Sequence, residues 1–349
     1  MKKMLAMLLA LVMVLSLAAC ASSQPAATDA AASTETAETT EAAEPAAEEP
    51  AEAPAESGKT YTVGVCQLVQ HEALDAATQG FVDALTEELG DAVTVDVQNA
   101  SGDSVNCGTI VNGFVSKGVD LIMANATPAL TAAVSATADI PILGTSITAY
   151  GVALDIDDFN GTVGGNVSGT SDLADLQAQA QMILDWFPET KTVGLLFCSA
   201  EPNSRYQIDE VRKALETQGV TCEEFAFTDS NDVSSVTQKA ADFSDVVYIP
   251  TDNTAASNTE AIANVLIPAG VPAICGEEGI CRGCGVATLS ISYYDLGVTT
   301  GKMAAKILKG EVDISTMPVE YTDATPKYNA SVCEQLGITP LDGYEAIDG

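Results

Sequence analysis

The sequence predicts an α/β protein made of two doubly wound parallel-sheet lobes, joined by a hinge in which the chain crosses several times. Strand and helix patterns alternate from residue 61 onward, which is typical of parallel sheets covered by helices. The order of these patterns then repeats, because residues 191–198 echo 61–67 and residues 270–275 echo 139–144. A repeat of this kind indicates two similar lobes.

The first lobe is expected to comprise residues 59–150 and 291–315. Gly118 is the expected C-cap of its second helix. Its strands are predicted at residues 61–67, 93–97, 120–124 and 140–144, and its helices at 74–89, 107–117, 128–137 and 294–308.

The second lobe is expected to comprise residues 151–290 and 316–349. Its strands are predicted at 191–198, 221–227, 245–249, 270–275, 286–290 and 319–321, and its helices at 204–218, 233–243, 254–269 and 330–336. A chain that continues past the second lobe can cross back to the first. Such crossings make a hinge over a cleft that opens and closes.

The first 58 residues are expected to lie outside the fold. Lys2 and Lys3 precede an apolar run over residues 4–17, which is typical of a signal peptide. The run ends in Leu-Ala-Ala-Cys20, similar to a bacterial lipobox, so residues 1–20 are predicted to be a lipoprotein signal peptide with Cys20 as the lipidated residue; the alternative is an ordinary signal peptide with a chance cysteine. Residues 21–58 contain no Lys or Arg and are rich in Ala, Glu and Pro, which predicts a disordered acidic tether.

The formal net charge of −35 excludes whole classes of partner. Nucleic acids need basic surfaces, so no nucleic-acid partner is expected. Attachment to an anionic lipid surface by charge is excluded for the same reason, and the only membrane contact expected is the lipid anchor.

Two strand ends define the predicted ligand site. The apolar run 246–249 is followed by Pro250, Thr251, Asp252 and Asn253, and the apolar run 120–124 also ends in small polar residues. Ligands of open α/β sheets bind outside the carboxyl ends of the strands. We expect Asp252 to receive a ligand ammonium group, although Asp and Asn are also the preferred helix N-caps.

Other polar residues at strand ends complete this predicted site. Hydroxyls of the first lobe, with N–H groups at helix starts, are expected to hold a ligand carboxylate. For the residues of the second lobe, helix capping or a solvated loop position remains the alternative. The predicted ligand-binding residues are Gln67, His71, Thr127, Thr145, Ser146, Asn203, Ser204, Asp252, Asn253, Glu277 and Tyr294, with Tyr150 and Tyr294 expected to face the ligand side chain.

No catalytic, cofactor or metal site is expected. His71 is the only histidine, so the chain can build neither a histidine metal site nor a nucleophile–histidine pair. Cys281 and Cys284 form a CxxC pair, which indicates a local disulfide or a reduced pair more than a redox motif. The other cysteines after Cys20 are Cys66, Cys107, Cys198, Cys222, Cys275 and Cys333, and their pairing stays open.

Seven phrases occur here in an order that resembles a known family. They are Gln67 with His71-Glu-Ala-Leu-Asp75, Ala126-Thr-Pro128, Pro141-Ile-Leu143, Gly165-Asn-Val-Ser-Gly-Thr-Ser-Asp172, Glu201-Pro-Asn-Ser204, Tyr248-Ile-Pro-Thr-Asp-Asn253, and Tyr293-Tyr-Asp-Leu-Gly297 with Gly301-Lys-Met-Ala-Ala305. From residue 61 to 341 the chain resembles the ABC-transporter substrate-binding lipoproteins that include the tryptophan-binding type. The resemblance implies the type I periplasmic-binding-protein fold with three crossings between the lobes.

The resemblance also implies a function. The expected protein is an extracellular lipoprotein on the outer face of the bacterial cytoplasmic membrane. It is not an enzyme, and it delivers an amino acid, with an aromatic one such as tryptophan expected, to an ABC permease. The permease's ATPase is a separate chain, since no GxxxxGK[ST] sequence is present. The family commonly has Asp-Pro where Ala149-Tyr150 stands here, which bears on ligand identity. The alternatives are a sensor module of the same fold and a thiol oxidoreductase that uses Cys281 and Cys284.

Overall fold

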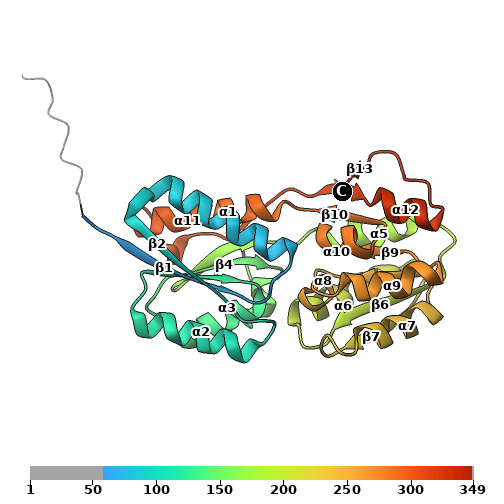
Figure 1. Ribbon diagram of the computed structural model, residues 1–349, viewed down its shortest axis with the longest axis horizontal. Coiled ribbons are helices and arrows are strands. Elements are labelled where there is room, and N and C mark those ends of the chain that lie inside the picture. The colour runs from blue at the N-terminus through green and yellow to red at the C-terminus, as the bar shows by residue number, and fades with distance from the viewer. Residues whose placement is uncertain (1–57, 348–349) are drawn as a thin grey trace, which may run out of the picture. The chain divides into compact units, whose positions relative to one another are not determined.

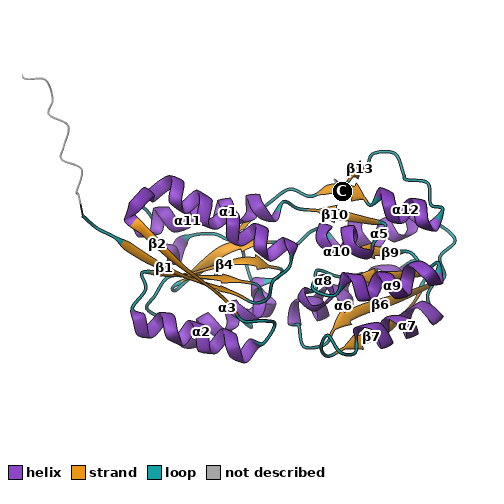
Figure 2. Ribbon diagram, in the orientation of Figure 1, coloured by secondary structure: helices purple, strands orange, loops and turns teal. Residues whose placement is uncertain are grey.

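Strands and helices alternate along the chain as the sequence predicts, and the strands form two mostly parallel sheets (Figures 1 and 2). The computed structural model describes residues 58–347. The expected signal peptide, Cys20 and the tether up to residue 57 lie outside the described residues. One compact unit of the chain holds both lobes.

The first lobe contains a six-stranded sheet in the order β11-β5-β4-β3-β1-β2, and every pair in it is parallel. Its strands are β1 (Tyr61–Gln67), β2 (Val93–Asn99), β3 (Leu121–Asn125), β4 (Ile142–Ile147), β5 (Val167–Ser171) and β11 (Glu320–Tyr321). Its helices are α1 (Glu72–Leu89), η1 (Gly90–Ala92), α2 (Ser104–Lys117), α3 (Thr127–Ala136), α4 (Tyr150–Ala153), α11 (Tyr293–Leu308) and η2 (Ile314–Thr316).

Helices cover both faces of this sheet because its central strands are apolar on both sides. Val63 and Val65 of β1 pack in one cluster with α1 and α11, whereas Cys66 packs with α2 and α3 on the other face. Helices α1 and α11 pack so closely that their backbones are in direct contact. A Cβ atom at Gly80 would lie 2.1 Å from the Tyr294 carbonyl oxygen, and one at Gly297 would lie 2.0 Å from that of Ala77. Only glycine permits this approach, which fixes α11 beside the start of α1.

The second lobe contains a seven-stranded sheet in the order β13-β12-β10-β9-β8-β6-β7, in which only the β10–β12 pair is antiparallel. Its strands are β6 (Thr192–Cys198), β7 (Thr221–Phe227), β8 (Val246–Ile249), β9 (Ala273–Cys275), β10 (Ala287–Ser290), β12 (Thr325–Tyr328) and β13 (Glu345–Ala346). One face packs against α5 (Leu176–Trp186), α6 (Pro202–Thr217) and α12 (Ala330–Leu336), and the other against α7 (Val233–Phe243), α8 (Asn253–Ala256), α9 (Thr259–Ala269) and α10 (Glu278–Cys284).

The chain passes between the lobes three times within the described residues: from β5 to α5, from β10 to α11, and from β11 to β12. The multi-crossing hinge is therefore present, but two boundaries differ from the prediction. Strand β5 pairs with β4, so the first lobe continues to Ser171 instead of ending at residue 150. Strand β11 pairs with β5, so residues 320–321 also belong to the first lobe. The first of these strands escaped the prediction because Val-Ser-Gly-Thr-Ser carries almost no apolar run.

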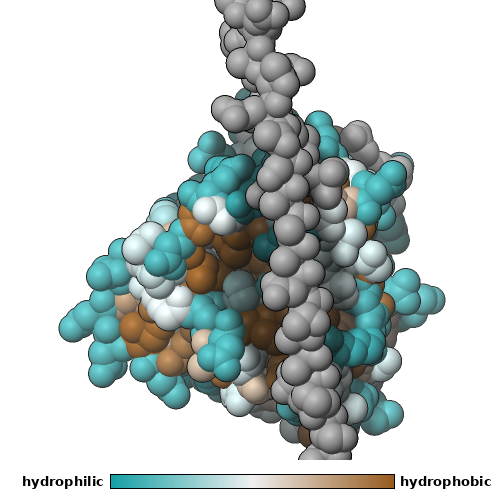
Figure 3. Space-filling model, turned by 90° about the vertical axis from the view of Figure 1, so that its left-hand side faces the viewer, coloured by the Kyte–Doolittle hydropathy of each residue, from teal (hydrophilic) through white to brown (hydrophobic). Residues whose placement is uncertain are grey.

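The surface carries few exposed hydrophobic side chains. Those of the described residues are Val97, Val105, Val152, Tyr294, Val312 and Tyr321. On the face of the first lobe shown in Figure 3, hydrophilic residues cover the periphery and hydrophobic residues gather nearer the centre. Among the residues that the structure describes, no helix is both long and apolar enough to cross a membrane.

Candidate ligand-binding site

A small cavity lies between the lobes, at the carboxyl ends of strands from both sheets. This inner cavity measures about 10 Å³, which is room for roughly one water molecule. Its position is the one that open α/β sheets use for ligands. The residues that line it are His71, Leu74, Ser146, Thr148, Asp172, Asn203, Thr251, Asp252, Asn253, Ala256, Glu277 and Tyr293.

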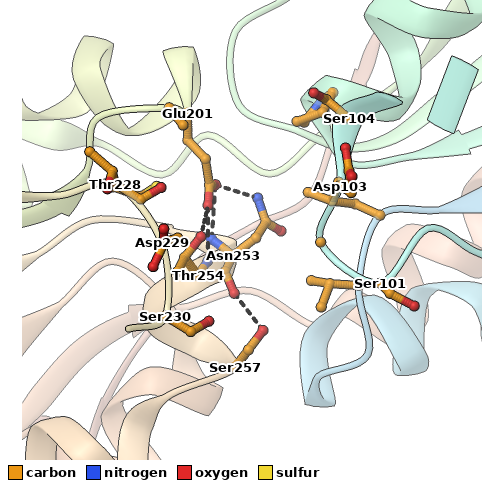
Figure 4. Close-up of a pocket in the computed structure, with 16 residues that line it drawn as sticks. Ser101, Asp103, Ser104, Glu201, Thr228, Asp229, Ser230, Asn253, Thr254 and Ser257 are labelled. Carbon is orange, nitrogen blue, oxygen red and sulfur yellow. Dashed lines mark hydrogen bonds between the residues drawn. The ribbon is translucent and has the colours of Figure 1, made fainter. Parts of the chain in front are cut away.

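A second, outer cavity of about 280 Å³ lies next to the inner one, and Asn253 lines both. Figure 4 shows Ser101, Asp103 and Ser104 of the first lobe facing Glu201 and Asp229 of the second lobe across it. No Lys or Arg lines either cavity. These two cavities are therefore lined by acidic side chains without a Lys or Arg beside them.

Both oxygens of the Asp252 carboxylate accept hydrogen bonds from protein donors. Its Oδ1 accepts from the Ala255 N–H at 2.8 Å, and its Oδ2 accepts from the Cys198 N–H at 2.6 Å and the Ser204 hydroxyl at 2.7 Å. Burial and the nearby charge of Glu201 raise the pKa of Asp252, and these donors oppose the rise. Asp252 thus borders the inner cavity mainly as the N-cap of α8.

Asp172 offers what Asp252 lacks, a free carboxylate oxygen. The Tyr293 hydroxyl donates to Oδ2 at 2.9 Å, while Oδ1 is buried without a partner. Asp172 is 4% exposed, and this burial raises its pKa. The sequence reading did not select Asp172 or Tyr293 as site residues. Because a buried acceptor without a donor is costly, Oδ1 is a candidate ligand contact.

Two more side chains of the inner cavity have buried atoms without partners, the Asn203 Oδ1 and the Ser146 Oγ. Asn203 is held through its amide nitrogen, which donates to the Thr251 carbonyl at 3.1 Å. Ser146 has φ 56°, and the pairing of β4 with β5 shifts register between Gly144 and Ile147. Strained backbone of this kind recurs where a side chain contacts a ligand. The predicted site residues Asn203 and Ser146 are therefore placed at the cavity with free hydrogen-bonding capacity.

His71 links the two lobes across the cleft. Its Nε2 lies 3.3 Å from the Asn253 Oδ1, and Asn253 is itself anchored because its amide nitrogen donates to Glu201 at 2.6 Å. Burial lowers the pKa of His71, so its ring is neutral at neutral pH. A second bridge joins Arg282 of α10 to Glu72 of α1 at 3.2 Å. Both partners of this ion pair are partly exposed, so it adds little to stability.

Glu277 lines the inner cavity as a helix cap. Its two carboxylate oxygens accept from the Gly279 and Ile280 N–H groups at the start of α10. Burial raises its pKa to about 7, against the effect of these donors. The alternative of a solvated loop position is excluded, since Glu277 is 2% exposed, and its predicted role as a ligand contact stays a prediction.

The structure places the other predicted site residues away from the inner cavity. Gln67 is satisfied by Asp75, Thr78 and Val69, and Thr145 by Thr170. Tyr294 is 43% exposed and donates to Asp83, and its neighbour Tyr293 lines the cavity instead. The residues of the predicted set that do not line the inner cavity are Gln67, Thr127, Thr145, Ser204, Tyr294 and Tyr150.

Tyr150 holds the first lobe together. Its hydroxyl donates to the carbonyl oxygens of Gly144 on β4 and Thr170 on β5, at 3.0 and 3.2 Å. It borders a different cavity of about 650 Å³, which shares only Thr148 with the inner cavity. Tyr150 therefore joins β4 to β5 and adds no contact at the inner cavity.

The cysteines of the described region are free, and most are buried. Cys281 and Cys284 lie on α10 at 0% and 1% exposure, and the Cys284 thiol donates to the Ile280 carbonyl at 3.3 Å. A reactive thiol needs access, so this burial argues against the oxidoreductase alternative. No group of three or more His, Cys, Asp or Glu among residues 58–347 has the geometry of a metal site.

Two α/β lobes that enclose a polar cavity at their strand ends define a protein that holds a small molecule between them. The family description "ABC transporter substrate binding protein" matches residues 62–343. The chain therefore belongs to the ABC transporter substrate-binding proteins, and its fold is that of the type I periplasmic binding proteins.

Relatives about one third identical are known. A tyrosine-binding protein of Clostridioides difficile (strain R20291) is 32% identical over 276 residues, which cover 77% of this chain and 79% of the relative. The structure of an ABC domain from Streptococcus pneumonia in complex with L-Trp is 32% identical, with 83% of this chain and 100% of that chain covered and a TM-score of 0.78.

A third relative is a ligand-free, open substrate-binding protein with adhesive properties from Clostridium difficile. It is 33% identical, with 83% of this chain and 99% of that chain covered and a TM-score of 0.63. At nearly equal identity, the chain superposes better on the L-Trp complex than on this open structure. The small volume of the inner cavity agrees with lobes that are closed.

Proposed function

We propose that the protein is the substrate-binding lipoprotein of an ABC importer and captures an aromatic amino acid between its lobes. The single observation that carries this proposal is the set of unpartnered buried atoms at one cavity, Asp172 Oδ1, Asn203 Oδ1 and Ser146 Oγ. They offer polar contacts where a ligand must lose its water. Relatives named for tyrosine binding and solved with L-Trp support the aromatic class.

Each end of the ligand has a proposed partner. The ammonium group lies against Asp172 Oδ1, with the Asn203 Oδ1 as a further acceptor. The carboxylate receives neutral donors, the hydroxyls of Ser146 and Thr148. Leu74 and Tyr293 supply the apolar and aromatic surface for the side chain.

Binding requires the lobes to separate first, because the inner cavity has no room for an amino acid. Opening breaks the contact of His71 with Asn253 and the Arg282–Glu72 ion pair, and the lobes then close around the ligand on a wider cavity than the one seen here. The closed form is the one presented to a membrane permease, whose ATPase is a separate chain.

The site is proposed to stand outside the cell, on the outer face of the bacterial cytoplasmic membrane, anchored through a lipid on Cys20. Metabolic labelling with a radioactive fatty acid tests the anchor. The wild-type protein should carry label in the membrane fraction, and a Cys20→Ala variant should carry none. Label on the variant would place the lipid elsewhere or exclude this anchor.

Isothermal titration of the purified protein with the twenty amino acids tests the ligand, with purines and small sugars as controls. We expect saturable binding of tyrosine or tryptophan and none of the controls. Binding confined to a sugar or purine would overturn the proposal. Import of the labelled amino acid by cells that lack this chain then separates a transporter component from a sensor module, because uptake is lost only in the first case.

A further inference from the structure

Most of the unpartnered polar atoms at the inner cavity are acceptors, so they need hydrogen-bond donors from a ligand. Asp172 Oδ1 and Asn203 Oδ1 can only accept, and both residues are 4% exposed. The third unpartnered atom, Ser146 Oγ, can donate or accept. A ligand that satisfies this set must bring N–H or O–H groups, which an ammonium group does and a carboxylate does not.

At the starts of α8 and α10, the N–H groups that could hold a ligand carboxylate are already occupied by protein carboxylates. Glu201 accepts from the N–H groups of Asn253 and Thr254 at 3.0 and 2.9 Å (Figure 4). Asp252 accepts from Ala255 at the same helix start. Glu277 does the same for α10, as described above. At these helix starts, carboxylates of the protein take the place that a ligand carboxylate would occupy.

The ionisable side chains that line the inner and outer cavities are acidic apart from His71, and the nearest cations, Arg282 and Lys327, pair with Glu72 and Glu278 outside them. Neither cavity is lined by Lys or Arg, and the ring of His71 is neutral. The acidic residues that line the two cavities are Asp103, Asp172, Glu201, Asp229, Asp252 and Glu277. A ligand carboxylate would enter among these groups with no cation to pair with, whereas an ammonium group enters a site of opposite charge.

We propose that the ammonium group is the part of the ligand that this cleft requires and that the carboxylate is dispensable, so that decarboxylated aromatic amines are a second class of ligand. The inference rests on the proposed function, since it concerns the same inner cavity. An amine keeps the contacts to Asp172 and Asn203 and the packing on Tyr293. It also avoids placing a further anion between the lobes.

Isothermal titration with three matched tyrosine analogues tests this inference on the full mature chain. They are L-tyrosine, tyramine, which lacks the carboxylate, and 3-(4-hydroxyphenyl)propanoate, which lacks the ammonium. Tryptophan, tryptamine and indole-3-propanoate form the parallel set. We expect the amine to bind within about tenfold of the amino acid, and the deaminated acid to bind at least roughly 100-fold more weakly.

An Asp172→Asn variant should lose the amine and the amino acid alike, because both depend on the same oxygen. Asp185→Asn, an exposed residue of α5, removes the same charge far from the cleft and should leave both affinities unchanged.

The outcomes separate this inference from the proposed function. If the amino acid binds and the amine does not, the carboxylate is required and the inference fails, while the proposed function stands. If the deaminated acid binds as well as the amino acid, the assigned role of the ammonium is wrong. If neither amino acid nor amine binds, both proposals fail.

Discussion

The Tyr293 hydroxyl donates to the Asp172 Oδ2 over 2.9 Å, and this bond joins two of the three chain crossings. Asp172 directly follows β5, where the chain first leaves the first lobe, and Tyr293 begins α11, where the chain has returned. Both side chains are buried. The same bond leaves Asp172 Oδ1 directed to no protein donor. A ligand that binds this oxygen is therefore held at the hinge itself.

Replacing Asp172 with Asn should abolish most ligand binding without unfolding the protein. The ammonium group would lose its only free carboxylate, which costs about 2–5 kcal/mol, or roughly 30- to 4,000-fold in affinity. Isothermal titration measures the affinity, and thermal unfolding confirms that the variant is folded.

Asp252→Asn is the matched control, because it makes the same substitution at a second buried carboxyl group of the same cavity. Its carboxylate serves Ala255, Cys198 and Ser204, so this variant should lose about 1–3 kcal/mol of unfolding free energy. The opposite result would be an Asp252→Asn protein of normal stability that no longer binds ligand and an Asp172→Asn protein that binds as the parent does. It would mean that Asp252 contacts the ligand and that Asp172 does not.

Tyr293→Phe should have a smaller effect on binding than Asp172→Asn. The change keeps the aromatic ring at the inner cavity and removes the donor that orients Asp172. A hydrogen bond to a charged group contributes about 1.5–3 kcal/mol, so we expect affinity to fall by roughly ten- to 100-fold. Tyr294→Phe is the control, since that hydroxyl contacts Asp83 on the surface. Equal losses in the two variants would contradict the assignment of Tyr293 to the site.

Most of the fold was predictable from the sequence because most of its strands are apolar runs. Strand β8 (Val246–Ile249) is fully buried, and its continuous apolar run predicts a buried strand. Strand β5 (Val167–Ser171) is equally buried, but small polar residues fill it, and Gly169 is required because a Cβ there would lie 2.0 Å from the Gly144 carbonyl oxygen. Patterns of hydrophobicity cannot detect a strand whose burial depends on close backbone approach, so the lobe boundary was misplaced.

The site was predictable as a region, but the roles within it were not. The strand ends that the sequence singles out place Asp252 and Asn253 at the inner cavity. Both oxygens of Asp252 are bound by donors such as the Cys198 N–H, which lies 54 positions away in the sequence. No sequence pattern reveals such a donor, so the sequence could not show which carboxylate has a free oxygen. Tyr293 could have been found, because it shares a buried helical stripe with Leu296 and Thr300, whereas Tyr294 falls off that stripe.

Glu277 predicts a pH dependence of stability. Its folded pKa is about 7, above the ordinary value of 4.5, so between these values the folded protein retains a proton that the unfolded chain has lost. The unfolding free energy must then fall as pH rises from about 4.5 to 7 and level off above, by roughly 3 kcal/mol for this group. Glu277→Gln should remove that part of the slope in urea unfolding measured across this range. Parallel curves for parent and variant would show that Glu277 does not titrate in this window.

The last prediction concerns motion of the lobes. The inner cavity of about 10 Å³ cannot admit an amino acid, so the protein must open to bind, and contacts such as that of His71 with Asn253 must break. That contact and the partly exposed Arg282–Glu72 pair hold the cleft only weakly, so a ligand that contacts both lobes shifts the equilibrium toward the closed form. Small-angle X-ray scattering should therefore show a smaller radius of gyration with saturating ligand than without it. Asp172→Asn at the same ligand concentration should keep the radius of the unliganded protein. An unchanged radius for the parent protein, with saturation confirmed by titration, would mean that the lobes do not close on the ligand and that it enters by another route.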